Sequence, residues 1–174
     1  SRGYKRKSSD EFVLVSDGRR VLVGPAEAGD EPYLIATRCP KAIVAVGADR
    51  AAVGRRVLSQ LEVDCIVLDD GFQHRQLARD LDVVLLDAMD ATGLDALLPA
   101  GRLREPLSGL RRAGAVVITR ADSKQDVAAV HARIDPVLTG KPVQAEVVFP
   151  ADSVVSVSTG EQRPLDWCVG KKAW

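Results

Sequence analysis

Apolar runs of strand length recur along this chain and constrain its fold more than any other feature. They are uniformly or largely apolar and cover residues 63–68, 81–86, 115–118 and 143–148. Segments with the apolar spacing of helices accompany them, at residues 51–61, 107–112 and 127–138. Strands that are apolar on both faces, interleaved with amphipathic helices, predict an α/β fold with a mostly parallel sheet covered by helices on both faces.

The N-terminal part adds a predicted hairpin. Residues 12–15 and 21–23 are β-rich runs on either side of Asp17-Gly18, a dipeptide typical of tight hairpin turns. Residues 27–37 are expected to form a short helix. Pro32 is compatible with this helix, because a proline near the start removes an N–H group that costs little there. A strand is expected at residues 42–46. The sequence therefore predicts an α/β core with an N-terminal β-hairpin insertion.

Both ends of the chain look cut from a longer protein. The first residue is Ser1, and the last residues, 169–174, resemble the entry to another strand. We expect residues 1–150 to form the core α/β domain, incomplete at its N-terminus. Residues 151–174 would begin a linker or a second, smaller domain.

Composition excludes some classes of function. The chain has 24 basic and 24 acidic residues, so no global field argues for a nucleic-acid partner. No apolar run approaches the roughly 20 residues that a membrane-spanning helix requires. The three cysteines, Cys39, Cys65 and Cys168, have no metal-ligand spacing and are expected to be reduced and partly buried.

Two adjacent carboxylates, Asp69 and Asp70, directly follow the apolar run at residues 63–68. Ligands of parallel sheets bind at the carboxyl ends of the strands, and Mg²⁺ commonly takes one or two carboxylates plus substrate phosphates. Gln73 and His74 add hydrogen-bonding groups to the same loop. The alternative is an ordinary polar turn, because Asp-Gly is common after strands. His131, in a helical stretch with apolar neighbours, is expected to be scaffold.

Two further polar clusters have ordinary explanations beside functional ones. Asp30 and Glu31 stand at a predicted helix start, where acids are favoured by capping and by the helix dipole. Arg102, Arg104 and Glu105 lie in a loop bounded by Pro and Gly. Arginines in such a loop can hold phosphate through paired donors, or they can simply be solvated.

One expected motif of a nucleotide enzyme is missing from these 174 residues. No GxxxxGK[ST] phosphate loop occurs anywhere in the chain. A nucleotide enzyme built on such a sheet would need one, and it could lie upstream of Ser1.

Taken together, five motifs resemble the tetraacyldisaccharide 4′-kinase family in their order and spacing. They are SRGY, GDEPYLIA, VGADR, VLDDGFQHRQLARDLDVVLLDA and LLPAGRLREPL. The resemblance runs from Ser1 to about Leu107 and is weaker through Thr119. It implies a P-loop kinase with a core α/β domain, a smaller C-terminal domain and a membrane-associated N-terminus.

The resemblance also implies roles for individual residues. Asp30 matches the base that activates the sugar hydroxyl, and Asp69 and Asp70 match acids near Mg²⁺ and the phosphates, with Gln73 and His74 beside them. The remaining matches are substrate- and phosphate-binding positions: Arg2, Tyr4, Glu31, Arg50, Arg104 and Glu105. The chain departs from the family pattern at Lys5, where glycine is usual, and at Arg102, where proline is frequent.

The activity that the resemblance implies is transfer of the γ-phosphate of MgATP to the 4′-hydroxyl of tetraacyldisaccharide 1-phosphate, in lipid A biosynthesis. The cofactors would be ATP and Mg²⁺. The lipid disaccharide would be met at the cytoplasmic face of the inner membrane of a Gram-negative bacterium. This piece alone would be inactive and would bind ATP poorly. The alternative is a non-catalytic α/β module that binds a sugar phosphate or a nucleotide.

One expectation concerns how these parts come together. Residues 63–68 are expected to form a central strand of the sheet, because the run is apolar apart from Asp64. Asp30, Asp69 and Arg104 are then expected to lie around one cleft at the carboxyl end of that strand.

Overall fold

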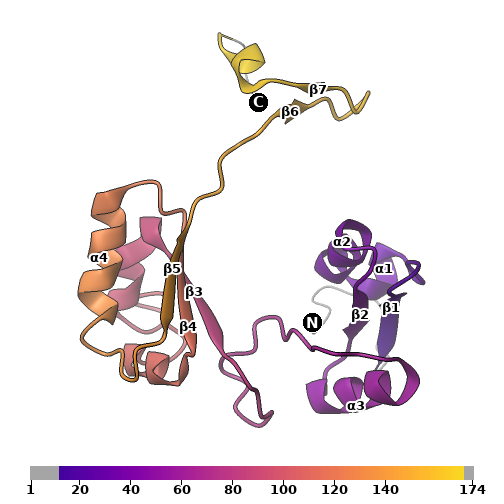
Figure 1. Ribbon diagram of the computed structural model, residues 1–174, viewed down its shortest axis with the longest axis horizontal. Coiled ribbons are helices and arrows are strands. Elements are labelled where there is room, and N and C mark those ends of the chain that lie inside the picture. The colour runs from indigo at the N-terminus through magenta and orange to yellow at the C-terminus, as the bar shows by residue number, and fades with distance from the viewer. Residues whose placement is uncertain (1–11, 171–174) are drawn as a thin grey trace. The chain divides into compact units, whose positions relative to one another are not determined.

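Residues 12–170 are described in the computed structural model, and they divide into two units between Arg79 and Asp80 (Figure 1). Each unit is considered by itself. The predicted boundary after residue 150 stays a prediction. Arg2 and Tyr4 lie outside the described residues.

The first unit is a two-stranded antiparallel sheet with short helices packed on it (Figure 1). Strand β1 pairs with β2, with Val13 opposite Val46 and an irregularity between Leu14 and Ser16. Helices α1 and α2 pack against β1, α2 and α3 pack against β2, and the core includes Val15 and Ala36. The elements are β1 (Val13–Asp17), α1 (Pro25–Ala28), α2 (Asp30–Arg38), β2 (Ile43–Val46) and α3 (Arg50–Gln60).

The predicted hairpin turn is present, but its second arm is short. Asp17 accepts hydrogen bonds from the backbone N–H groups of Arg19 and Arg20, and Gly18 has a φ of 81° that favours glycine. The returning arm makes only an isolated bridge between Ser16 and Val21. Because α1 begins at Pro25, the arm has no room to extend.

The helix predicted at residues 27–37 is two helices. Gly29 separates them with a φ of 89°, ending α1 and serving as the N-cap residue of α2. Pro32 is the third residue of α2, where its missing N–H would have no intrahelical partner in any case. The turn at Gly29 therefore sets the start of α2 at Asp30.

The prediction that residues 63–68 form a central strand is wrong for this structure. The segment has no regular secondary structure, and the side chains of Ile66 and Val67 are 54% and 89% exposed. A strand exists only where neighbouring chain supplies hydrogen-bond partners, and no strand among residues 12–170 pairs with this segment. An apolar run is therefore not by itself evidence that a strand partner is present.

The second unit contains the predicted parallel sheet, in the strand order β3-β4-β5. The register places Val83 opposite Ala115 and Ala115 opposite Val143. The strands are β3 (Val83–Asp87), β4 (Ala115–Thr119) and β5 (Val143–Val147), joined through the 3-10 helices η1 (Ala88–Asp95) and η2 (Leu107–Arg112) and the helix α4 (Lys124–Ile134). The chain continues into a short pair, β6 (Val154–Val155) and β7 (Gln162–Arg163), and the 3-10 helix η3 (Leu165–Cys168).

Helix α4 covers one face of this sheet (Figure 1). Ser123 caps the helix by accepting from the backbone N–H of Asp126, and Val127, Val130 and Ile134 are buried at helical spacing. On the other face, the alternate residues of β3 are exposed: Val83 by 47% and Leu85 by 64%. The segment predicted as a helix at residues 107–112 is present as the 3-10 helix η2.

The expectation of partly buried cysteines is also wrong. Cys39, Cys65 and Cys168 are all free and exposed. Cys65 lies in the segment that has no strand partner, while Cys39 caps the end of α2 and Cys168 ends η3. No helix within residues 12–170 combines the length and apolarity needed to cross a bilayer.

Candidate functional site

The loop that carries Asp69 and Asp70 is held at its start by Arg50, the first residue of α3. The Arg50 guanidinium donates to the backbone carbonyl of Asp69 at 2.9 Å and to that of Asp70 at 3.1 Å. Arg50 is only 7% exposed, and its Nε has no hydrogen-bond partner among the described residues. These bonds engage main-chain carbonyls and leave both carboxylates on the exposed side of the loop.

The backbone at this point is a tight turn. Asp70 has a φ of 48°, and a Cβ on Gly71 would lie 2.6 Å from a methyl carbon of Leu68. A larger residue at position 71 would therefore displace the Leu68 side chain, and aspartate at position 70 tolerates the left-handed conformation better than most residues. The polar-turn interpretation is thus correct for the backbone. An ordinary turn of this kind forms without a buried arginine. The bonds from Arg50 to the carbonyls of Asp69 and Asp70 are therefore an additional feature of this loop.

The predicted hydrogen-bonding residues follow on the same loop. Gln73 is exposed and His74 is half-buried, and the backbone N–H of His74 donates to the carbonyl of Gly71 at 2.8 Å. Asp49 caps α3 through the backbone N–H of Ala52, and that bond lowers the pKa of Asp49, with smaller contributions from Arg55 and His74. His74 therefore lies within electrostatic reach of the α3 N-terminus, where Arg50 holds the loop.

Asp30 does not act as a helix cap in this structure. It is the first residue of α2, it is exposed, and the N-cap position belongs to Gly29. Asp30 and Glu31 still lie in the first helical turn, where negative charge is favoured by the helix dipole. The side-chain capping explanation for Asp30 is therefore removed, and the dipole explanation remains.

Glu105 belongs to the second unit and is engaged by an arginine. The Arg112 guanidinium lies 2.9 Å and 3.0 Å from the two Glu105 carboxylate oxygens, and both side chains are largely shielded from solvent. A Cβ on Gly109 would lie 2.5 Å from one of those oxygens, so glycine makes room for the carboxylate. In the same loop, Arg102 pairs with Asp90 at 2.9 Å.

The loop before Glu105 is closed by main-chain hydrogen bonds. The N–H of Leu98 donates to the carbonyl of Leu103, the N–H of Leu103 donates to the carbonyl of Ala96, and Leu98-Pro99 is a cis peptide. A Cβ on Gly101 would lie 2.2 Å from the carbonyl oxygen of Ala96, which only glycine avoids. The loop therefore presents Arg104 from a well-defined backbone.

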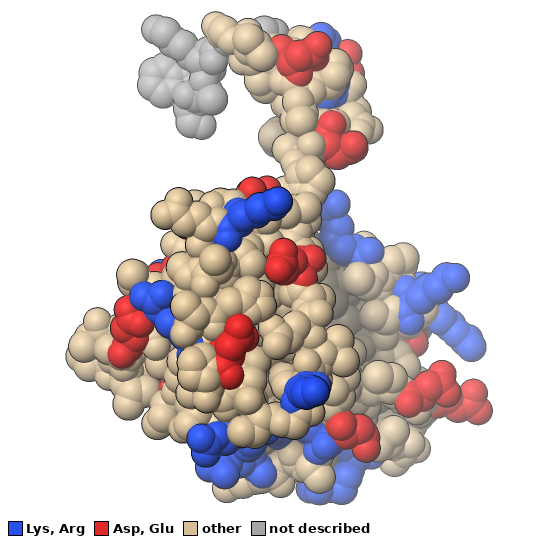
Figure 2. All heavy atoms as spheres, turned by 60° about the vertical axis from the view of Figure 1, so that its left-hand side comes forward, with Lys and Arg blue, Asp and Glu red and all other residues tan. Residues whose placement is uncertain are grey.

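Opposite charges are interspersed on the face of the second unit that Figure 2 turns forward. The ion pairs within this unit include Arg120 with Asp87, at the carboxyl ends of β4 and β3, and Arg133 with Asp95 at 2.6 Å. The hydrogen bond from Arg133 lowers the pKa of Asp95 and raises that of Arg133. The first pair links the end of β3 to the residue after β4, and the second links η1 to α4.

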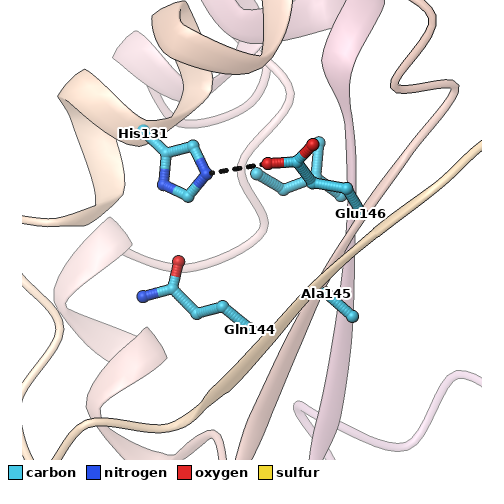
Figure 3. A pocket seen from close by; sticks show the side chains of 5 residues that line it. His131, Gln144, Ala145 and Glu146 are labelled. Carbon is cyan, nitrogen blue, oxygen red and sulfur yellow. Dashed lines mark ion pairs between the residues drawn. The ribbon is translucent and has the colours of Figure 1, made fainter.

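His131 lines a cavity of about 180 Å³ between α4 and β5 (Figure 3). Its Nε2 lies 3.8 Å from Glu146, and its Nδ1 lies 3.3 Å from Asp135. The other lining residues are Ile118, Gln144 and Ala145. His131 joins the helix to the edge strand, which is the scaffold role that its sequence position predicts.

Among the described residues, the two carboxylates at Asp69 and Asp70 fit Mg²⁺. No group of three or more His, Cys, Asp or Glu side chains within residues 12–170 could hold a metal ion. Mg²⁺ does not need such a cage, because it usually retains water and binds one or two carboxylates plus phosphate oxygens. Two exposed acids on a loop with a fixed main chain meet that requirement.

The structure brings part of the predicted site together. Asp69, Asp70, Gln73 and His74 share one loop at the N-terminus of α3, held there by Arg50. Asp30 and Glu31 lie in the same unit, on α2, whereas Arg104 and Glu105 lie in the other unit. The expectation of one cleft formed by Asp30, Asp69 and Arg104 stays a prediction.

A model of the family described as tetraacyldisaccharide-1-P 4′-kinase matches residues 1–168. The chain belongs to this family. Tetraacyldisaccharide 4′-kinase of Geobacter sulfurreducens is 41% identical over 165 residues, which are 95% of this chain and 44% of that protein. The corresponding protein of an Anaeromyxobacter species is 53% identical over 128 residues, covering 74% of this chain and 34% of that protein. The chain therefore spans less than half the length of these two curated relatives.

A solved member of the tetraacyldisaccharide 4′-kinase family has the same fold. It is a crystal structure described as an apo form of LpxK from Aquifex aeolicus in complex with ATP, with a TM-score of 0.68 and 39% sequence identity. The match covers 99% of this chain and 50% of the other. The α/β fold of a P-loop kinase, predicted from the apolar runs and the family motifs, is thereby confirmed.

Replacing Arg50 with methionine is expected to lower the free energy of unfolding by about 2–4 kcal/mol, because its two charge-assisted hydrogen bonds to the carbonyls of Asp69 and Asp70 are lost. Denaturant unfolding of the full-length protein measures this change. Arg55→Met, an exposed position on the same helix, should stay within about 0.5 kcal/mol of the wild type. Equal stability of the Arg50 and Arg55 variants would show that the hydrogen bonds of Arg50 contribute nothing to the fold.

Proposed function

We propose that the full-length protein transfers the γ-phosphate of MgATP to the 4′-hydroxyl of tetraacyldisaccharide 1-phosphate. The observation that carries this proposal is the family match over residues 1–168. The ATP named for the Aquifex relative supports ATP as the donor. The arrangement of the loop at residues 69–79, with two exposed carboxylates on a fixed main chain, supplies the chemistry that phosphoryl transfer requires.

The proposed roles follow from where the side chains lie. Asp30, exposed at the start of α2, accepts the proton of the attacking sugar hydroxyl. Asp69 and Asp70 would hold Mg²⁺, which supplies charge neutralisation at the phosphates when bound. Gln73 and His74 orient the phosphates from the same loop. Contacts to substrate or phosphate are proposed for Arg2, Tyr4, Glu31, Arg50, Arg104 and Glu105.

Such a site works by placement and electrostatics. Phosphoryl transfer asks little covalent chemistry of the protein, so most of the rate enhancement comes from aligning acceptor and donor and stabilising the developing charge. The hydrogen bonds of Arg50 suit this task, because they fix the backbone from which the side chains of Asp69 and Asp70 extend. For Arg50, the bonds to the carbonyls of Asp69 and Asp70 add this anchoring role to the proposed contact with substrate or phosphate.

The partner and place of action are proposed from the family. The acceptor is a lipid disaccharide, so the protein would meet it at a membrane surface, which we propose to be the cytoplasmic face of the inner membrane. Residues 1–174 contain no GxxxxGK[ST] motif. We therefore propose that this segment alone binds ATP poorly and is inactive.

The test is transfer of labelled γ-phosphate by the full-length protein in detergent micelles. Tetraacyldisaccharide 1-phosphate should become labelled in the presence of Mg²⁺, whereas an acceptor already phosphorylated at the 4′ position should not. Labelling of neither acceptor, with ATP and lipid both bound, would overturn the kinase proposal. That result would favour a non-catalytic module that binds a nucleotide or sugar phosphate.

A further inference from the structure

The far end of the Asp69 loop is held by a second arginine, to which neither the motifs nor the family match assigns a role. Arg50 fixes the carbonyls of Asp69 and Asp70 at the start of the loop. Arg79, the last residue of the first unit, reaches back over the loop at its end. Both arginines act on main-chain oxygens.

The contacts of Arg79 are short and specific. Its Nη1 atom donates to the carbonyl of His74 at 2.6 Å and to the carbonyl of Leu77 at 2.9 Å. Bonds from a charged donor are shorter and about twice as strong as those between neutral groups. The side chain is half-buried, so water competes less well for these oxygens.

These bonds fix the backbone that carries Gln73 and His74. The carbonyl of His74 accepts from Arg79, while the N–H of His74 donates to the carbonyl of Gly71. Both polar groups of the His74 main chain are thus engaged within the loop.

We propose that Arg79 is a positioning residue for phosphoryl transfer: it holds the main chain at residues 74–77 so that His74 and Gln73 meet the phosphates in a fixed orientation. The inference rests on the proposed function. Arg79 does not touch the substrate in this scheme and acts only through the loop. Misplacement of a reacting group by about 1 Å can cost 100-fold in rate, so such a role has a measurable effect.

The kinetic test compares Arg79→Met, Arg79→Lys and Arg38→Met in the full-length protein. Arg79→Met should lower kcat by about 10- to 100-fold and change KM for ATP by less than about threefold. Arg79→Lys should recover part of the loss. The lysine side chain reaches less far than that of arginine, but its ammonium group can still donate to one carbonyl. Arg38→Met, an exposed position at the end of α2, should behave as the wild type. Melting curves on the same samples separate loss of folded protein from loss of turnover.

Amide hydrogen exchange makes the inference testable without any substrate. In Arg79→Met, peptides covering residues 70–77 should exchange about tenfold faster than in the wild type, while α4 is unchanged. Unchanged exchange in the loop would overturn the inference, whatever the activity. Faster exchange with unchanged kcat would also overturn it, because the loop would then be held without being needed for the reaction.

The same measurements keep the two proposals apart. If the wild-type protein labels no acceptor, the proposed kinase function fails, and with it the positioning role in that reaction. If the wild type is active but Arg79→Met retains its kcat, only the inference about Arg79 fails.

Discussion

Asp30→Asn in the full-length protein is expected to lower kcat by about 100-fold or more, because the asparagine cannot accept the proton of the attacking hydroxyl. General-base assistance is typically worth about 10² to 10⁴ in rate. The KM for ATP should change little, since the proposed base faces the acceptor and not the nucleotide.

The local structure makes this substitution a clean test. Gly29, and not Asp30, is the N-cap residue of α2, so no side-chain cap is removed. Asparagine has nearly the same size as aspartate, and Glu31 keeps a negative charge in the first helical turn. We therefore expect the melting temperature to remain near that of the wild type.

Transfer of labelled γ-phosphate to the disaccharide lipid measures the effect, with a melting curve recorded on the same sample. Asp64→Asn is the matched control, because Asp64 is an exposed acid in the same unit outside the proposed site. Full activity of Asp30→Asn at an unchanged melting temperature would leave Asp30 as a residue that only favours the helix start. The base would then have to be another group.

Asp69→Asn and Asp70→Asn are each expected to lower kcat by about tenfold or more, because each removes a carboxylate proposed to hold or orient Mg²⁺. At least one of them should also need more Mg²⁺ for half-maximal rate. A neutral amide oxygen is a weaker ligand for this hard cation than a carboxylate.

The backbone of the loop should survive both substitutions. Arg50 holds the carbonyls of Asp69 and Asp70, which asparagine retains. Asparagine also tolerates the positive φ of 48° at position 70, whereas alanine would strain it. The two variants therefore change the charge of the site without changing how its main chain is held.

A Mg²⁺ titration of the rate, with Asp64→Asn as control, distinguishes the metal site from a polar turn. Near-wild-type rates for both variants at limiting Mg²⁺ would show that the two acids belong only to the turn. If both variants lose rate but keep the Mg²⁺ dependence of the wild type, the two acids act in the reaction by some means other than holding Mg²⁺.

The parallel sheet of the second unit could be predicted because its signals are local. Three apolar runs became β3, β4 and β5, and the spacing of Val127, Val130 and Ile134 became the buried face of α4. Asp17-Gly18 likewise became a turn, since its geometry depends on neighbouring residues only. The element boundaries moved by a few residues where caps, such as Ser123, decide them.

The sequence proposed residues for the candidate site, and their roles stay predictions, but it did not indicate how the loop that carries them is held. The adjacent acids, the following glycine and the family motifs pointed to the loop at residues 69–74 and to Asp30. Nothing in the sequence spacing indicated that the Arg50 guanidinium would bind carbonyls 19 and 20 residues away. Arg79 was missed for a similar reason, because an arginine in a polar loop has no pattern that reveals its acceptor.

The sequence by itself determined the family, the α/β class and the position of the two carboxylates after an apolar segment. Turn chemistry, helical periodicity and short motifs are properties of neighbouring residues, so they can be read without knowing the fold. The tertiary structure alone decided that residues 63–68 are not a strand, that Gly29 and not Asp30 is the N-cap residue of α2, and that two arginines hold the acidic loop. Each of these depends on a hydrogen-bond partner or a backbone angle, which are satisfied in space and not along the chain.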